Sequence, residues 1–123
     1  VHGLAGVIGG ETGAPHGAIC ARLLPPVLAA NRQACAAAGH DMAKFEALDA
    51  IVAQAFDLAG QPAPAEHALS AFLDRAGLPR LRAITGQDMD REKIARLSQG
   101  ASSMKANPVP LSVDTLQGIL ANA

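Results

Sequence analysis

Residues 1–17 read VHGLAGVIGGETGAPHG, a glycine-rich stretch with a histidine near each end. A single helix over this span would put His2 and His16 nearly on one face, but about 21 Å apart at about 1.5 Å rise per residue. Both cannot then reach one metal ion, because a Zn–N bond is only about 2.0–2.1 Å long. If the two histidines share an ion, the chain must break and fold back between them.

The residues between the histidines allow this reversal. Gly9 and Gly10 predict the end of a helix that covers residues 1–8, and Pro15 suits the first position of a new helix, where its missing N–H would be unpaired anyway. His16 would then stand in the first turn, where the positive helix end favours the neutral imidazole that binds metals. The alternative is a pair of unrelated surface histidines, and spacing alone leaves both interpretations open.

Composition and charge narrow the class of protein. The chain has 123 residues, which fits one domain. Half of the residues (50%) are apolar, and three phenylalanines are the only Phe, Tyr or Trp residues. The formal net charge is −1, so nothing directs the chain to nucleic acid or to acidic lipid. No apolar run reaches the roughly 20 residues of a membrane span, and no signal peptide is visible. We therefore expect no nucleic-acid partner and no membrane insertion.

Cys20 and Cys35 are the only cysteines, and their separation matches no zinc-binding spacing. We interpret them as small buried apolar residues of a reduced, cytoplasmic protein.

The periodicity of apolar residues predicts helices throughout, and no stretch alternates apolar and polar residues as a strand would. Gly60 is expected to end one helix before a stiff linker over residues 61–64, and the pair Pro25-Pro26 to interrupt another. The prediction is a single all-α domain over residues 1–123, a helical bundle of about seven segments. Besides residues 1–8, the expected helical segments are 15–24, 27–38, 44–59, 65–76, 78–85, about 91–103 and 113–122.

Buried faces and caps follow from the same pattern. Asp41, Ser112 and either Asp88 or Asp90 are expected to cap the helices that follow them. The inward stripe of segment 44–59 is the clearest, and those of the later segments include Phe72 and Leu97. That clearest stripe comprises Phe45, Leu48, Ile51, Val52, Ala55, Phe56 and Ala59.

Three other polar positions have open interpretations. Glu11 is either a solvated turn residue or a partner of a metal-binding histidine. His40 and His67 are expected on the surface, in a loop and on an outer helix face.

The opening residues also resemble a known family. Val1-His2-Gly3-Leu4-Ala5, followed by Gly9 and by Ala14-Pro15-His16-Gly17, is similar to the second metal-binding segment of the iron-containing alcohol dehydrogenases. The resemblance continues through residues 23–27 to Asn31, which fits the asparagine that often ends the family's second helix. It returns at residues 106–112, Ala-Asn-Pro-Val-Pro-Leu-Ser, before the last helix. Within the family, the Gly9-Gly10 pair and the Pro15-His16 turn look closest to maleylacetate-reductase-like members.

The resemblance implies an NAD(P)-linked dehydrogenase or reductase acting on a small alcohol or carbonyl compound. It implies that His2 and His16 are metal ligands for Fe2+ or Zn2+, shared with an aspartate and a histidine on an upstream helix. It also implies that NAD or NADP is bound mainly by an upstream nucleotide-binding domain, and that the C-terminal domain is all helical. By itself the chain is expected to bind metal weakly and to be inactive; the parent enzyme could form a homo-oligomer.

Some features depart from the family or qualify the resemblance. Many members carry a further histidine at the position of Gly6, near substrate and nicotinamide. The chain begins inside an apolar stretch without a methionine, which indicates a C-terminal piece of a larger protein. Ser103 or Lys105, in a region that lies near the family's interdomain cleft, could line a substrate pocket; a solvated helix end is the alternative.

A different class of function also fits the sequence. An alanine-rich helical chain could be a non-enzymatic interaction or scaffold domain. An upstream Asp-x-x-x-His pair and a glycine-rich nucleotide loop would favour the enzyme, and their absence would favour the scaffold.

Overall fold

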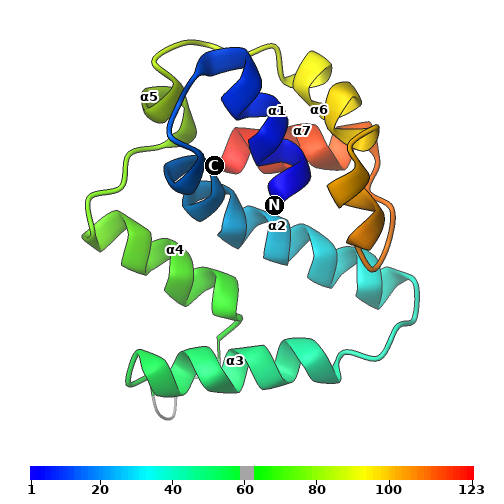
Figure 1. Cartoon of the computed structure of the whole chain (residues 1–123). Coiled ribbons are helices and arrows are strands. Elements are labelled where there is room, and N and C mark those ends of the chain that lie inside the picture. Colours follow the sequence, from blue (N-terminus) through cyan, green and yellow to red (C-terminus); the bar gives the residue numbers. More distant parts are fainter. Residues whose placement is uncertain (59–62) are drawn as a thin grey trace.

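A computed structural model describes residues 1–58 and 63–123, and within these ranges all the regular secondary structure is helical, which confirms the predicted all-α class (Figure 1). The helix α2 runs through the middle of the molecule. Helices α1, α6 and α7 lie on one side of α2, and α3 lies on the opposite side (Figure 1). The elements are α1 His2–Thr12, α2 His16–Ala37, α3 Ala43–Ala55, α4 Ala65–Arg75, α5 Leu81–Thr85, α6 Arg91–Gln99, the 3-10 helix η1 Ser102–Ala106 and α7 Val113–Asn122.

The main core lies between α1, the first half of α2, α6 and α7. Leu4, Ile8, Ile19, Leu23 and Leu116 are its largest fully buried apolar side chains in this region. Burying side chains of this size contributes roughly 1.5–3 kcal/mol each. Since α1 and α2 both present apolar residues to the same cluster, this core fixes the relative position of their first turns.

Both predicted helix breaks near the start are wrong. Helix α1 passes through Gly9 and Gly10 and ends only at Gly13, whose φ of 71° is the left-handed conformation that glycine adopts readily. Helix α2 likewise continues through Pro25 and Pro26 as one helix. Pro25 is buried and its neighbours Leu23 and Val27 lie in the core, so packing on both sides of the prolines outweighs the missing N–H donors.

The helix observed in place of the predicted segment 44–59 is shorter than that segment. Helix α3 ends at Ala55, and Asp57 has a positive φ of 53°. Ala59 as an inward position, the stop at Gly60 and the first half of the linker 61–64 lie outside the described residues. The inward stripe is also wrong in part: Ile51 is 63% exposed, and Val52 is the one residue of α3 that counts as buried. Helix α3 packs mainly on α4, so much of its apolar face has no neighbour among the described residues.

Further expectations about inward positions and helix bounds also fail. Leu97 and Phe72 are 48% and 45% exposed, although both were expected inward. The segment expected over 91–103 divides into α6, which ends at Gln99, and η1. Asn31 lies within α2 instead of at its end, and its Oδ1 accepts a hydrogen bond of 3.0 Å from Asn107 Nδ2.

The predicted caps are mostly confirmed. Asp90 accepts a hydrogen bond from the Lys93 amide at the start of α6, and Ser112 accepts one from Thr115 at the start of α7. Asp41 accepts one from the Ala43 amide, although the residue directly before α3 is Met42.

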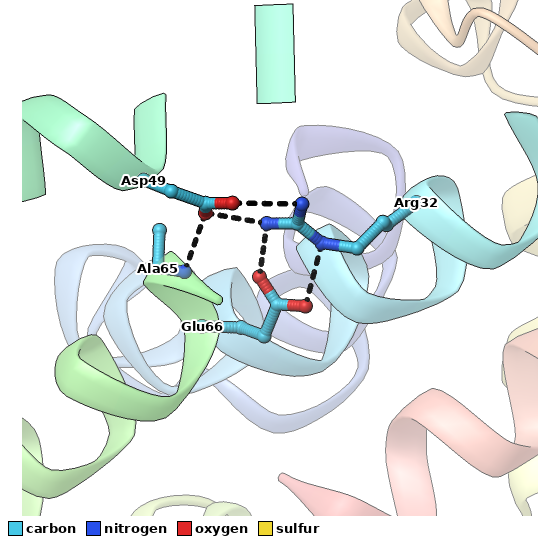
Figure 2. A network of polar contacts seen from close by, with 4 residues as sticks. All are labelled: Arg32, Asp49, Ala65 and Glu66. Atoms are coloured by element: carbon cyan, nitrogen blue, oxygen red, sulfur yellow. Dashed lines mark hydrogen bonds and ion pairs between the residues drawn. The ribbon is translucent and has the colours of Figure 1, made fainter. Parts of the chain in front are cut away.

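Two arginines of α2 join it to the later helices. Arg22 is almost fully buried, and its guanidinium donates to Asp74 at 2.8 Å and to the carbonyls of Leu78 and Pro79. These bonds satisfy a charge that would otherwise be costly to bury. Arg32 lies between Asp49 of α3 and Glu66 of α4 and bonds to both carboxylates (Figure 2).

Among the described helices, none combines the length and the apolar character that crossing a membrane requires.

Candidate metal centre

His2 and His16 are brought together by the fold. His2 is the first residue of α1 and His16 the first residue of α2, and residues 13–15 reverse the chain between the two helices. Their ring centroids lie 5.6 Å apart, with the ring planes inclined at 47°. Both side chains are exposed. The two imidazoles therefore stand side by side at an accessible edge of the domain.

The turn between the helices has a clear local basis. Gly13 takes the left-handed conformation, and its N–H donates to the Gly9 carbonyl at 2.9 Å. The Thr12 hydroxyl donates to the Ile8 carbonyl and accepts from the Ala14 amide. Pro15 directly precedes the first helical residue, one position earlier than expected, with an extended ψ of 117°. These constraints start α2 at His16.

The 3-10 helix η1 packs against the first turn of α1. Gly3 is buried, and a Cβ at this position would overlap the Met104 side chain. The same Cβ would lie 3.5 Å from the Ser103 hydroxyl oxygen. The residue next to His2 is thus in close contact with Met104, and any side chain at this position would require Met104 to move.

Cys20 completes a group that the sequence did not predict. Its Sγ lies 3.4 Å from His16 Nε2, one helical turn away. Within the part of the chain that the structure describes, His2, His16 and Cys20 are the only group of three or more His, Cys, Asp or Glu residues whose ligand atoms gather closely enough for one ion, all within 4.8 Å. The signal available in the sequence was the separation of four between His16 and Cys20, which puts both on one helix face.

The donor chemistry of this group fits a transition metal. Imidazole nitrogen suits Zn2+ and Fe2+, and a thiolate suits Zn2+. The group is accessible, so further ligands from outside this chain have room to approach. Structural zinc sites have four protein ligands, so the three donors here leave a position that this group does not fill.

The other candidates lie apart from the group. Glu11 belongs to α1 instead of a turn and forms an ion pair of 2.7 Å with Lys93, whose pKa is raised by that contact. It therefore does not serve the histidines here. His40 and His67 are exposed, as expected. Lys105 borders a surface hollow with Gln99, Met104, Asn107, Pro110 and Leu111, so its substrate-pocket role stays a prediction.

Comparison with known proteins identifies the family. The whole chain, residues 1–123, matches the family described as Fe-containing alcohol dehydrogenase family, C-terminal. The chain belongs to this family, and its all-helical fold agrees with the assignment. No curated protein and no solved structure matches the chain.

Proposed function

We propose that this chain is the C-terminal, metal-binding part of an NAD(P)-linked dehydrogenase or reductase for a small alcohol or carbonyl compound. In this proposal His2 and His16 are ligands of the metal ion, Fe2+ or Zn2+. One observation carries it: two imidazoles from the starts of different helices lie 5.6 Å apart in a chain of the Fe-containing alcohol dehydrogenase family. A longer protein would supply the remaining ligands and the nucleotide-binding domain.

The two imidazoles would hold the ion and leave most of its charge uncancelled, because both are neutral ligands. When bound, a divalent ion supplies Lewis-acid polarisation of a carbonyl or alcohol oxygen. The nicotinamide cofactor supplies the hydride chemistry. The chain's own contribution is to position the ligands through the packed first turns of α1 and α2.

Gly6 bears on the proton chemistry. This position lies on the exposed side of α1, and a Cβ placed there would meet no atom within 4 Å. The side chain that many relatives have at this position is thus absent here, and the space is open. A proton relay at this point would need water or a group from another part of the enzyme.

Metal binding is tested with histidine variants. Zn2+ is titrated into the purified chain by calorimetry, and the His2→Ala and His16→Ala variants are compared with His67→Ala, an exposed histidine of α4. We expect the first two to weaken binding by at least about tenfold, because each removes a ligand. The His67 variant should bind as the unmodified chain does. Equal binding by all four proteins would contradict the proposal.

Dehydrogenase activity is tested separately. The coding sequence upstream of Val1 is searched for an Asp-x-x-x-His pair and a glycine-rich nucleotide loop. The longer protein is then assayed with Fe2+ or Zn2+, NAD or NADP, and a panel of aldehydes together with the keto acid maleylacetate. We expect activity in the longer protein, its loss in His16→Ala, and none in residues 1–123 alone. An upstream region that contains neither motif would contradict the enzyme assignment.

Self-association is a second candidate role, which the exposure of large apolar residues supports. Ile51 is 63% exposed on α3 and Phe72 is 45% exposed on α4. Burial of such residues between copies would favour a homo-oligomer. Sedimentation analysis of the unmodified chain and of Ile51→Glu tests this: a larger species that the substitution dissociates supports it, and a monomer at all concentrations contradicts it.

A further inference from the structure

We propose that Cys20 is a third metal ligand, so that the chain itself offers two nitrogens and one sulfur to a single ion. This inference rests on the proposed metal-binding function of His2 and His16 and adds a donor to it. The three ligand atoms come from the first turn of α1 and the first two turns of α2, and all lie within 4.8 Å of one another.

The distance between two of these atoms fits one ion. In a tetrahedral site with a Zn–N bond of about 2.1 Å and a Zn–S bond of about 2.3 Å, the nitrogen and sulfur stand about 3.6 Å apart. Cys20 Sγ and His16 Nε2 are 3.4 Å apart. The two side chains, one helical turn apart, thus stand close to the separation that a shared ion requires.

His2 must move closer to join them. In a tetrahedral site the donors stand about 3.4–3.6 Å apart at these bond lengths. The largest separation within the group is no more than 4.8 Å, so closing it takes at most about 1.2–1.4 Å. The His2 side chain is exposed, so rotation of its ring can supply this movement while Leu4 and Ile8 hold its helix in the core.

The two cysteines of α2 differ in surroundings. Cys35 is 3% exposed, as predicted for a structural cysteine. Cys20 is half-buried, and its sulfur faces an imidazole nitrogen. The prediction of a buried apolar cysteine therefore holds for Cys35 and only in part for Cys20, which packs against the core but remains half-buried.

A sulfur donor changes which ions the site prefers and how tightly it holds them. Thiolate and imidazole together suit Zn2+ and Co2+, whereas Mg2+ and Mn2+ prefer oxygen ligands. Two histidine ligands, the number expected from the sequence, predict weak metal binding by the chain alone. A third donor raises the affinity of the chain itself, and the remaining coordination positions stay open to ligands from outside this chain.

Cobalt binding tests the sulfur ligand directly, with a readout that does not depend on enzyme activity. Co2+ is added to the purified, reduced chain, and the near-ultraviolet absorption from thiolate-to-cobalt charge transfer is recorded together with the visible bands. The unmodified chain, Cys20→Ser, Cys20→Ala and Cys35→Ser are compared, after circular dichroism has shown that each is helical. Cys35→Ser is the matched control because it removes the other thiol of the same helix.

We expect the charge-transfer band in the unmodified chain and in Cys35→Ser, and its loss in both Cys20 variants. Cobalt affinity should fall at least about tenfold in the Cys20 variants, as expected when a group of the site is removed. Visible cobalt bands that depend on His2 but come without charge-transfer absorption would overturn the role of Cys20 and leave the histidine site standing. No cobalt binding, or binding that His2→Ala and His16→Ala do not affect, would overturn the proposed function itself.

Discussion

The Arg32 guanidinium forms a paired contact with the Asp49 carboxylate, through hydrogen bonds of 2.6 and 3.0 Å that join α2 to α3 (Figure 2). The same guanidinium bonds to both oxygens of Glu66, each at 2.9 Å, and lies 5.0 Å from the centre of the Phe45 ring. Asp49 also accepts a hydrogen bond of 2.7 Å from the backbone amide of Ala65, the first residue of α4. Since α3 buries little apolar surface, this polar contact is a main attachment of α3 to the body of the domain.

Replacing Arg32 by methionine should loosen this attachment. The substitution keeps an apolar stem but leaves Asp49 and Glu66 facing each other without a cation, and Glu66 is only 6% exposed. Breaking a partly buried pair of this kind should cost about 2–3 kcal/mol, between the values for exposed and buried pairs. Denaturant unfolding measures the cost. Relative to the unmodified chain, the variant should show a larger increase in the hydrogen-exchange rate of α3 than in the rates of α1 and α7.

The matched control is Arg96→Met. Arg96 is exposed and pairs with Glu92 one turn earlier at 2.7 Å, so the loss should be less than about 0.5 kcal/mol. Equal losses in the two variants would contradict a special role for Arg32.

Acid should weaken the same contact. Burial acts to raise the pKa of Asp49, but the hydrogen bonds from Arg32 and from the Ala65 amide outweigh it and hold that pKa below its ordinary 3.8. A carboxyl group whose pKa is lower in the folded state stabilises the fold above about pH 4, and this stability is lost as pH falls through the folded pKa. We expect Asp49→Asn to flatten the fall in unfolding free energy below about pH 4.

The pH profile of the variant must still decline somewhat. Asp74, which bonds to Arg22, also has a lowered pKa and remains in place. If the unfolding free energy of Asp49→Asn falls with pH in parallel with that of the unmodified chain, Asp49 does not contribute to the acid-dependent loss of stability.

Gly3→Ala should destabilise the chain and disturb the metal group. A Cβ there would overlap Met104, and overpacking of this kind costs about 1–3 kcal/mol even though a methionine side chain can move. Gly6→Ala, in the same helix and facing open space, should instead stabilise by about 0.5–1 kcal/mol. Thermal unfolding of the two variants compares these effects. Zn2+ titration should show weaker binding in Gly3→Ala alone, because the substitution shifts the turn that carries His2.

Features that depend on neighbouring residues were predictable from the sequence. The caps at Asp90 and Ser112 are formed by hydrogen bonds within one turn, so the local residue types suffice to find them. The reversal between His2 and His16 could be expected from the glycines and Pro15 that lie between them. The resemblance at residues 1–17 supplied the family.

Features that depend on tertiary packing were not. Gly9-Gly10 and Pro25-Pro26 are breaks by propensity, yet core contacts carry both helices through them. The stripe containing Ile51 has correct helical spacing, but periodicity does not show whether another element covers it. The separation of Cys20 from Cys35 matches no zinc-binding spacing and predicts a buried apolar residue, but periodicity does not show that the Cys20 sulfur lies 3.4 Å from His16 Nε2.

Ser98→Ala should stabilise the chain. Ser98 lies in α6 with no exposed surface, and its hydroxyl has no hydrogen-bond partner within residues 1–58 and 63–123. A buried hydroxyl without a partner costs about 1–3 kcal/mol relative to its hydrated state, and alanine removes that cost while leaving only a small void. Alanine also has the higher helix propensity, by a few tenths of a kcal/mol.

The control for helix propensity is Ser70→Ala, a half-buried position within α4. It should gain only the propensity part, up to about 0.5 kcal/mol. Denaturant unfolding should therefore place Ser98→Ala about 1 kcal/mol above Ser70→Ala in unfolding free energy. A loss of stability in Ser98→Ala would show that the hydroxyl does make a stabilising contact, and it would remove the reason for treating this position as a defect of the core.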